Sequence, residues 1–178
     1  MNARVRSERL TYRPVTPADL DAFHGLVRDE HVRRYLMDGN VFPPEWSAGQ
    51  IRDSQALFAS TGIGLWLAHD SQSGALVGFC GFLVLPEVHA RPELVYAMAE
   101  QFTGRGLATE MARASIAEAR AHAPLDEILA SVDEVNAASV RVLDKLGFER
   151  AGTKPGAFGN MLMMRLTADA LPIPAARP

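Results

Sequence analysis

The sequence predicts an α/β protein of the α+β type, in which a central mixed β-sheet of six to seven strands is flanked by about four helices. Three observations carry this prediction: two segments of helical period come first, three strand-like segments follow in succession, and helices and strands then alternate. Successive strands without a helix between them pair antiparallel, whereas strands joined through a helix pair parallel. The sheet is therefore expected to be mixed and covered by helices on both faces.

The N-terminal part is expected to form a short extended segment followed by two helices. Thr16 and Pro17 suit the cap and the first position of a helix, and the apolar residues Leu20, Phe23 and Val27 fall on one helical face. Residues 43–60 carry apolar side chains at loosely helical spacing, which is typical of a second amphipathic helix. The turn-rich segment "MDGNVFPP" is predicted to connect the two.

The remaining elements follow from the period of their apolar residues. Residues 62–70 are predicted to form a strand, and the apolar run within 74–87 is typical of a central strand that is covered on both sides. Further strands are expected at 93–100, 127–133, 147–153 and 160–167, and further helices at about 107–121 and 136–146. Residues 1–178 are expected to form a single domain, with 168–178 as a loosely ordered, proline-rich tail.

Composition excludes several classes of function. The net charge of -3 provides no global basic field, so neither nucleic acid nor an acidic membrane is an expected partner. The single cysteine shows no adaptation to an oxidising compartment, and the N-terminal segment has no apolar core typical of a secretory signal. The longest apolar run is much shorter than the roughly 20 residues of a membrane-spanning helix, so a cytoplasmic location is expected.

The segment "QFTGRGLATEMARAS" predicts an anion site at the start of a helix. Gly104 and Gly106 allow positive φ and close approach of the backbone to a ligand. The helix that begins at about Leu107 would present unpaired N–H groups and a positive dipole end, and Arg105 could add a full charge. An ordinary tight turn explains these glycines equally well. The segment lacks the "GK[ST]" of a P-loop and fits the dinucleotide-binding fingerprint poorly.

A second segment, "NAASVRVLDKLGFERAG", has a simple structural interpretation. Asn136 is a good helix cap, Gly147 is a good helix stop, and Lys145 complements the dipole of the last turn.

The two segments together resemble the GCN5-related N-acetyltransferase (GNAT) family. The first resembles its Q/R-x-x-G-x-G/A signature through Gln101, Gly104 and Gly106. The second resembles a downstream "N-x-x-S … K-x-G-F" segment, here Asn136, Ser139, Lys145, Gly147 and Phe148. The segments "ERLTYRPVTPADLDAF", "RRYL…PPEW" and "ELVYAM" are similar to the RimJ/RimL-like branch, so that the resemblance extends over about residues 8–167.

This resemblance implies acetyl-CoA as the co-substrate and no metal. The backbone amides from Gln101 to Ala108 would hold the pyrophosphate of coenzyme A, and its pantetheine arm would lie along "LVYAM" where two strands splay apart. Asn136 and Ser139 would lie near the pantetheine and the sulfur. The cofactor-binding residues expected in this way are Tyr96, Ala97, Met98, Gln101, Phe102, Thr103, Gly104, Arg105, Gly106, Leu107, Ala108, Asn136, Ser139 and Lys145.

Two departures from the family pattern concern the site. Many members carry a tyrosine seven residues after the asparagine, where it can protonate the departing thiolate, but Leu143 stands there. Ser139 is the candidate acid in its place, as in the RimL-like branch. Thr103 stands where that branch commonly has tryptophan, a change that the backbone donors would survive.

A carboxylate is needed to remove a proton from the acceptor amine, because a free lysine titrates near roughly 10.4 and an α-amino group near roughly 8. Glu93 is the candidate base: it matches a family position at the start of the strand before the signature, and alternation places it on the same face as Val95 and Ala97. A solvated strand-end carboxylate is an equal alternative. Glu100 is less suitable because it would repel the pyrophosphate.

Other interpretations stay open at this point. Cys80 lies within an apolar strand and is expected to be an inert buried thiol, and the five histidines show no metal-ligand spacing. Because Leu143 replaces the family tyrosine, a non-catalytic acyl-CoA-binding regulator on the same fold is an alternative function. A nucleotide-dependent oxidoreductase is a distant third alternative. The acceptor is a protein N-terminus or a small-molecule amine, and "HVRRYLMDGNVFPPEW" and "TKPGAFGN" are expected to build its pocket. A homodimer is an open alternative.

Overall fold

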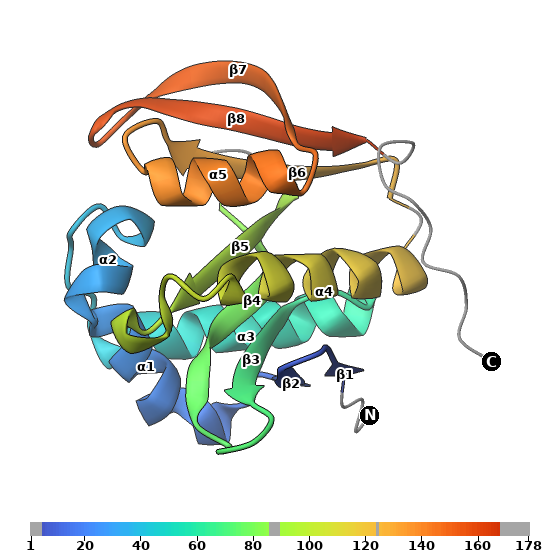
Figure 1. The fold of residues 1–178 in the computed structure, drawn as a ribbon. Helices are drawn as coiled ribbons and strands as arrows, with labels where there is room; N and C mark the ends of the chain where they lie inside the picture. Colours follow the sequence, from blue (N-terminus) through green and yellow to red (C-terminus); the bar gives the residue numbers. More distant parts are fainter. Residues whose placement is uncertain (1–4, 86–89, 124, 168–178) are drawn as a thin grey trace.

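A computed structural model describes residues 5–85, 90–123 and 125–167. These residues form an eight-stranded sheet with the order β1-β2-β3-β4-β5-β6-β8-β7 (Figure 1). The strands are β1 (Val5–Arg6), β2 (Leu10–Pro14), β3 (Leu65–Asp70), β4 (Leu76–Val84), β5 (Pro92–Met98), β6 (Glu127–Asp133), β7 (Glu149–Gly156) and β8 (Gly159–Thr167). All neighbours pair antiparallel except β5 and β6, which are parallel, so the sheet is mixed as predicted.

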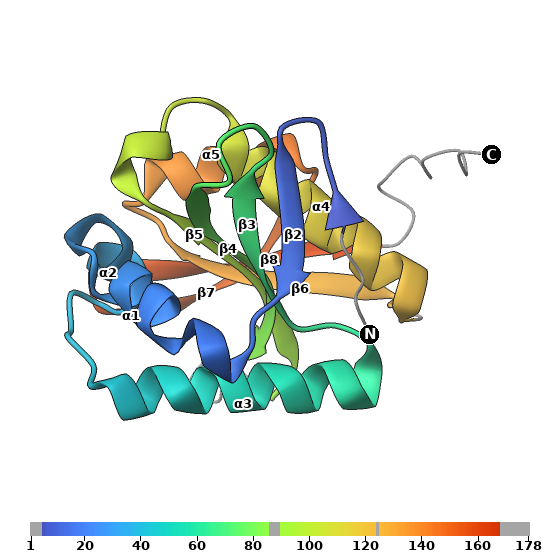
Figure 2. The ribbon, with the colours of Figure 1, turned by 90° about the horizontal axis from the view of Figure 1, so that it is seen from below.

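Helices cover both faces of this sheet. They are α1 (Leu20–Arg28), α2 (Glu30–Leu36), α3 (Pro44–Thr61), α4 (Leu107–His122) and α5 (Ala137–Lys145), with short 3₁₀ turns at Pro17–Asp19 and Glu100–Phe102. One core cluster joins α1, α2 and α3 to one face, and two others involve α4 on the opposite face. Figure 2 shows α3 on one side of the strands and α4 with α5 on the other.

The predicted fold is confirmed, with more elements than expected. The described residues contain eight strands where six to seven were predicted, and five α-helices where about four were predicted. The additions include β1, a two-residue strand, and α2, a seven-residue helix that starts directly after α1. Asp29 caps α2 by accepting hydrogen bonds from the N–H groups of His31 and Val32, so no glycine or proline marks the boundary. The predicted tail at 168–178 lies outside the described residues.

The gap between β5 and β6 is the feature of the fold that matters most for function. β5 pairs with β4 along its whole length, but it meets β6 at the single register position Glu93 to Leu129. Beyond this point the two strands diverge, so the backbone of residues 94–98 presents an edge toward β6. The predicted splay between two strands is therefore present.

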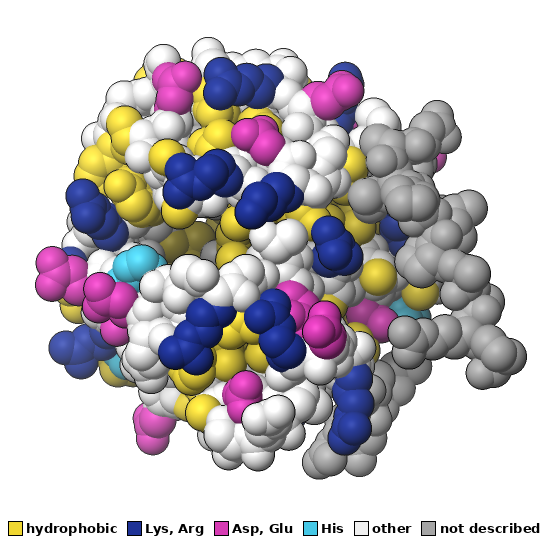
Figure 3. All heavy atoms as spheres, viewed as in Figure 1, with side chains coloured by type: hydrophobic (Ala, Val, Ile, Leu, Met, Phe, Trp, Pro, Cys, Tyr) yellow, Lys and Arg dark blue, Asp and Glu magenta, His cyan; other side chains and the backbone are white. Residues whose placement is uncertain are grey.

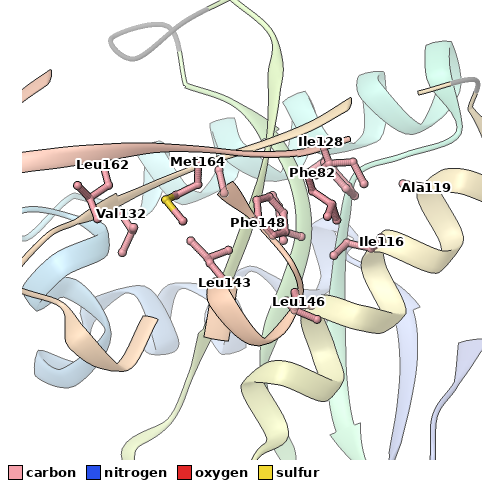
Figure 4. Close-up of a cluster of buried hydrophobic side chains, with 14 of the residues drawn as sticks. Phe82, Ile116, Ala119, Ile128, Val132, Leu143, Leu146, Phe148, Leu162 and Met164 are labelled. Atoms are coloured by element: carbon pink, nitrogen blue, oxygen red, sulfur yellow. The ribbon is translucent and has the colours of Figure 1, made fainter. Parts of the chain in front are cut away.

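A continuous apolar core links the two halves of the sheet across this gap. It contains Phe82 from β4, Ile116 from α4, Val132 from β6, Leu143 from α5 and Met164 from β8 (Figure 4). Leu143 is 1% exposed, so the residue at the position of the family tyrosine is a core residue. None of the described helices is long and apolar enough to cross a membrane.

Candidate coenzyme A and acceptor site

A cavity of about 1040 Å³ opens where β5 and β6 diverge. Its lining comes from β5, β6, the start of α4, α5, α2 and the β7–β8 hairpin. Figure 3 shows the opening as a hollow between α5 and the segment before α4, with hydrophobic side chains at its back and Lys and Arg side chains above and below it. The cavity therefore reaches both faces of the sheet.

The glycine-rich loop before α4 offers a row of backbone donors to this cavity. Gly104 and Gly106 have φ values of +73° and +76°, and a Cβ at Gly104 would meet no atom within 4 Å, so the loop is open to a ligand. The first hydrogen bond of α4 runs from the N–H of Glu110 to the carbonyl of Gly106, at 3.2 Å. Within the described part of the chain, the N–H groups of residues 104–109 make no hydrogen bond. Six donors at a positive dipole end fit a pyrophosphate.

A polar clamp from the N-terminus holds this loop in place. The Glu110 carboxylate accepts hydrogen bonds from the Ser7 hydroxyl (2.5 Å) and from the backbone N–H and side chain of Arg9 (2.8 and 2.7 Å). The same Arg9 guanidinium donates to the carbonyl of Arg105 at 2.8 Å. Burial raises the pKa of Glu110, but the hydrogen bonds from Ser7 and Arg9 outweigh this effect and lower it below the ordinary value. The Glu110 carboxylate in this clamp therefore stays ionised.

The structure brings most of the predicted cofactor-binding residues to this cavity. The lining includes Tyr96, Ala97, Met98, Thr103, Gly104, Gly106, Leu107, Ala108, Asn136, Ser139 and Lys145. Gln101, Phe102 and Arg105 do not line it. The Arg105 guanidinium instead lies 5.9 Å from the centre of the Phe102 ring.

Tyr96 and Ser139 form a hydroxyl pair across the gap. Their side-chain oxygens lie 2.7 Å apart, and the Tyr96 hydroxyl is 3.3 Å from the Ser139 carbonyl. Asn136 caps α5 by accepting from the Ser139 N–H at 3.2 Å, which fixes where Ser139 points. Burial raises the pKa of Tyr96 to about 12, partly offset by the hydrogen bond with Ser139. Tyr96 thus stays protonated at neutral pH.

Glu93 lies inside the cavity on the opposite face of β5. Its side chain is 1% exposed and accepts a hydrogen bond from the Ser131 hydroxyl at 2.6 Å. The alternative of a solvated strand-end carboxylate is therefore wrong. Val95 and Ala97 pack with the core on the α1–α3 side, so Glu93 faces the side where α2 lies, as the alternation of a strand requires.

Aromatic and acidic side chains surround this second side of the cavity. Tyr35, Phe42 and Trp46 line it, and the Tyr35 ring meets Phe158 of the β7–β8 turn edge to face at 5.7 Å. This contact joins the two segments that were expected to build the acceptor pocket. Asp133, at the end of β6, also lines the cavity and is 7% exposed.

Sequence reasoning missed Asp133 and the pairing of Tyr96 with Ser139. An aspartate at the end of a strand is an ordinary turn residue, and nothing in its neighbours in sequence marks it as buried. The pairing of Tyr96 and Ser139 joins residues 43 positions apart, so only the vacancy left by Leu143 hinted that another hydroxyl was needed.

Cys80 takes no part in this site, and among the described histidines His31, in α2, lines the cavity. Cys80 is buried in β4, and burial raises the pKa of its thiol to about 12, as expected for an inert thiol. Among the residues described, no three His, Cys, Asp or Glu side chains gather to hold a metal ion. His89 lies outside the described residues.

Comparisons with known proteins agree with the geometry. A family model described as an acetyltransferase (GNAT) domain matches residues 9–149. The uncharacterized N-acetyltransferase YoaA of Bacillus subtilis is 27% identical over 148 residues, which cover 83% of this chain and 84% of that protein.

Two solved structures share the fold. A GNAT-family acetyltransferase structure from Bordetella pertussis matches with a TM-score of 0.80 at 22% identity, covering 92% of this chain and 99% of that one. RimL, a ribosomal L7/L12 α-N-protein acetyltransferase in complex with coenzyme A, matches with a TM-score of 0.77 at 17% identity, covering 94% and 99%.

Proposed function

The chain belongs to the GNAT family of acetyltransferases, and we propose that it moves an acetyl group from acetyl-CoA directly to a primary amine within a ternary complex. The observation that carries the proposal is the continuous path formed by the β5–β6 gap and the donor loop at residues 104–109. Acetyl-CoA supplies the acetyl group as a thioester. The family membership and this path support an enzyme over the regulator considered from sequence.

Coenzyme A fits the residues of this path. The free N–H groups of residues 104–109 would bind the pyrophosphate, and the open edge of β5 at residues 94–98 would pair with the pantetheine arm as a neighbouring strand does. Arg141 and Lys145, exposed on α5 at the cavity, would add positive charge near the phosphates.

The proposed chemistry uses one group on each face of β5. Glu93 would accept the proton that leaves the amine nitrogen as that nitrogen bonds to the acetyl carbon and the carbon–sulfur bond breaks. The departing thiolate would take a proton from the Ser139 hydroxyl as that hydroxyl takes one from its hydrogen-bond partner Tyr96, and after product release Tyr96 would regain a proton from solvent while Glu93 returns one to solvent. This pair would fill the role that Leu143 leaves vacant.

The acceptor is proposed to be a primary amine, either a small molecule or a protein N-terminus. RimL, whose fold this chain shares, is a protein acetyltransferase by its name, while the closed contact between Tyr35 and Phe158 favours a small ligand. Because the co-substrate is a product of central metabolism, we place the enzyme in the cytoplasm.

A thiol-release assay over a panel of amines, run beside calorimetry with acetyl-CoA, tests the proposal. We expect acetyl-CoA to bind and free thiol to appear in the presence of at least one primary amine but not of tertiary amines. If acetyl-CoA binds but no amine raises thiol release above the rate of acetyl-CoA hydrolysis, the alternative of a non-catalytic acyl-CoA-binding regulator would be favoured. Absence of binding would remove the proposal altogether.

A further inference from the structure

The side of the cavity that faces α2 contains a buried carboxylate that the proposed reaction does not use. Asp133 is 7% exposed and lines the cavity, and within residues 5–85, 90–123 and 125–167 its carboxylate forms neither a hydrogen bond nor an ion pair. A carboxylate that is largely removed from water and has no partner in the protein is costly to keep ionised, and the Asp133 oxygens stay accessible from the cavity. A ligand of opposite charge bound in the cavity would offset this cost.

The surroundings of Asp133 favour a cation. Burial, and after it the negative charge of Asp38 in the loop after α2, raise the pKa of the Asp133 carboxyl. The backbone at Gly156 lies so close that a Cβ there would be 3.2 Å from the Asp133 carboxylate, so the β7–β8 hairpin shields it from solvent. Both effects increase the attraction of a positive charge.

Positive side chains also line the cavity, and two of them, His31 and Arg34, come from α2 on the same side as Asp133, but within the described residues none forms an ion pair with Asp133. The basic residues among the lining are His31, Arg34, Arg141 and Lys145, and all four are exposed. The carboxylates of Glu93 and Asp133 are the buried charges of the lining. The aromatic rings of Tyr35, Phe42 and Trp46 lie on the same side, where Phe42 stacks on Trp46 and the Arg34 guanidinium lies 5.3 Å from the centre of the Tyr35 ring.

The positions along β6 of Ser131, which donates to Glu93, and of Asp133 suggest the length of the ligand. Ser131, which donates to Glu93, and Asp133 are two residues apart on β6 and so point to the same face, about 6.6 Å apart along the strand. A short carbon chain with an amino group at each end spans a comparable distance.

We propose that Asp133 binds a second positive charge on the acceptor, so that the preferred substrates are small molecules in which a second cationic group lies a short carbon chain away from the reacting amine. The inference rests on the proposed function, because it assigns Asp133 to the acceptor of that reaction. Glu93 takes the proton of the reacting amine, and Asp133 holds the other end of the molecule. Asp133 is therefore a specificity-determining residue.

The test compares 1,4-diaminobutane with 1-aminobutane as acceptors. The ratio of kcat/KM for the diamine to that for the monoamine is expected to exceed about tenfold in the wild-type enzyme and to approach one in Asp133→Asn. Glu134→Gln is the matched control: it removes the same charge one residue away, from an exposed side chain that bonds to Asn160 and is paired with Arg150, and it should keep the preference.

Two further measurements separate the outcomes. Calorimetry of each amine with the coenzyme A complex reports binding without turnover, and thermal unfolding of Asp133→Asn should show a melting temperature that is unchanged or raised, because an unpaired buried charge is removed. Equal use of both amines, or a preference that persists in Asp133→Asn, would overturn the inference and leave the acetyltransferase standing. An equal loss of turnover with both amines would also overturn it.

Failure of the proposed function gives a different set of binding and turnover results. Diamine binding that depends on Asp133, without acetylation of any amine, would support the cation site and refute the transferase. Binding of neither amine would refute the cation site.

Discussion

At the scale of single residues, Glu93 combines complete burial with a direct hydrogen bond from Ser131 at the point where β5 and β6 part. Under the proposed function, a carboxylate enclosed beside the acceptor amine can take the proton of its ammonium form directly. The position, and not the residue type alone, suits Glu93 to act as the base.

Glu93→Gln should lower kcat/KM by about 10² to 10⁴-fold at pH values below the pKa of the acceptor amine, because the variant cannot take up the proton. The loss should shrink as the pH rises and the free amine forms unaided. Pre-steady-state or steady-state rates from pH 6 to 10 measure this, and the affinity for acetyl-CoA, measured by calorimetry, serves as the control that should not change. A loss of equal size at every pH would remove Glu93 from the mechanism.

At the scale of elements, the entry into α1 is held by Asp19. The Arg13 guanidinium of β2 donates two hydrogen bonds, of 2.7 and 2.5 Å, to the Asp19 carboxylate. The backbone N–H and the hydroxyl of Thr16 donate to the same carboxylate. The hydrogen bonds from Arg13 and Thr16 lower the pKa of Asp19 from 3.8 to about 2 against the opposing effect of burial. The capping box thus ties the first helix to the sheet.

This clamp predicts a dependence of stability on pH. Because the folded pKa lies below the ordinary value, the stabilisation is complete above about pH 4 and is lost as the pH falls toward 2. Asp19→Asn should lower the free energy of unfolding by about 1 to 3 kcal/mol at pH 7, and by progressively less below pH 4. Urea titrations at several pH values measure this, with Asp21→Asn, an exposed change in the same helical turn, as the neutral control. A difference that grows on acidification would contradict the clamp.

The elements that the sequence predicted best are those whose signals are local. Thr16 with Pro17 marked a helix start, Gly147 marked a helix end, and the period of residues 127–133 located β6 with its observed bounds. α2 was missed because it follows α1 across the single residue Asp29, and β1 because two residues carry no period. The divergence of β5 and β6 was predicted from the family resemblance. The proposed cation site around Asp133 could not be predicted, because it forms only where β6, the β7–β8 hairpin and the loop after α2 meet in space.

At the scale of the whole molecule, the core around Leu143 joins the two halves of the sheet. Residues of β4, β5, α4, β6, α5 and β8 contribute to it, and Leu143 reaches it from the helix that carries Ser139 and follows Asn136. The side chain that replaced a family tyrosine therefore has a structural role.

Leu143→Ala should lower the free energy of unfolding by about 2 to 5 kcal/mol, because it leaves a cavity in packed core. Chemical denaturation followed by circular dichroism measures this. Val135→Ala, which shortens a side chain that is 56% exposed just before α5, should change stability little. A similar small effect at Leu143 would mean that the two halves are not joined through this core.

The divergence of β5 from β6 also makes the folded state incomplete by itself. From residue 94 onward one edge of β5 has no strand beside it, and a pantetheine arm paired there acts as the missing strand of the sheet. A ligand that binds only the folded chain stabilises it by about 2.7 kcal/mol at a concentration one hundred times its dissociation constant. Under the proposed function, the resistance of this protein to unfolding and proteolysis therefore rises and falls with the coenzyme A concentration in the cell. The co-substrate thus also stabilises the fold of the enzyme that consumes it.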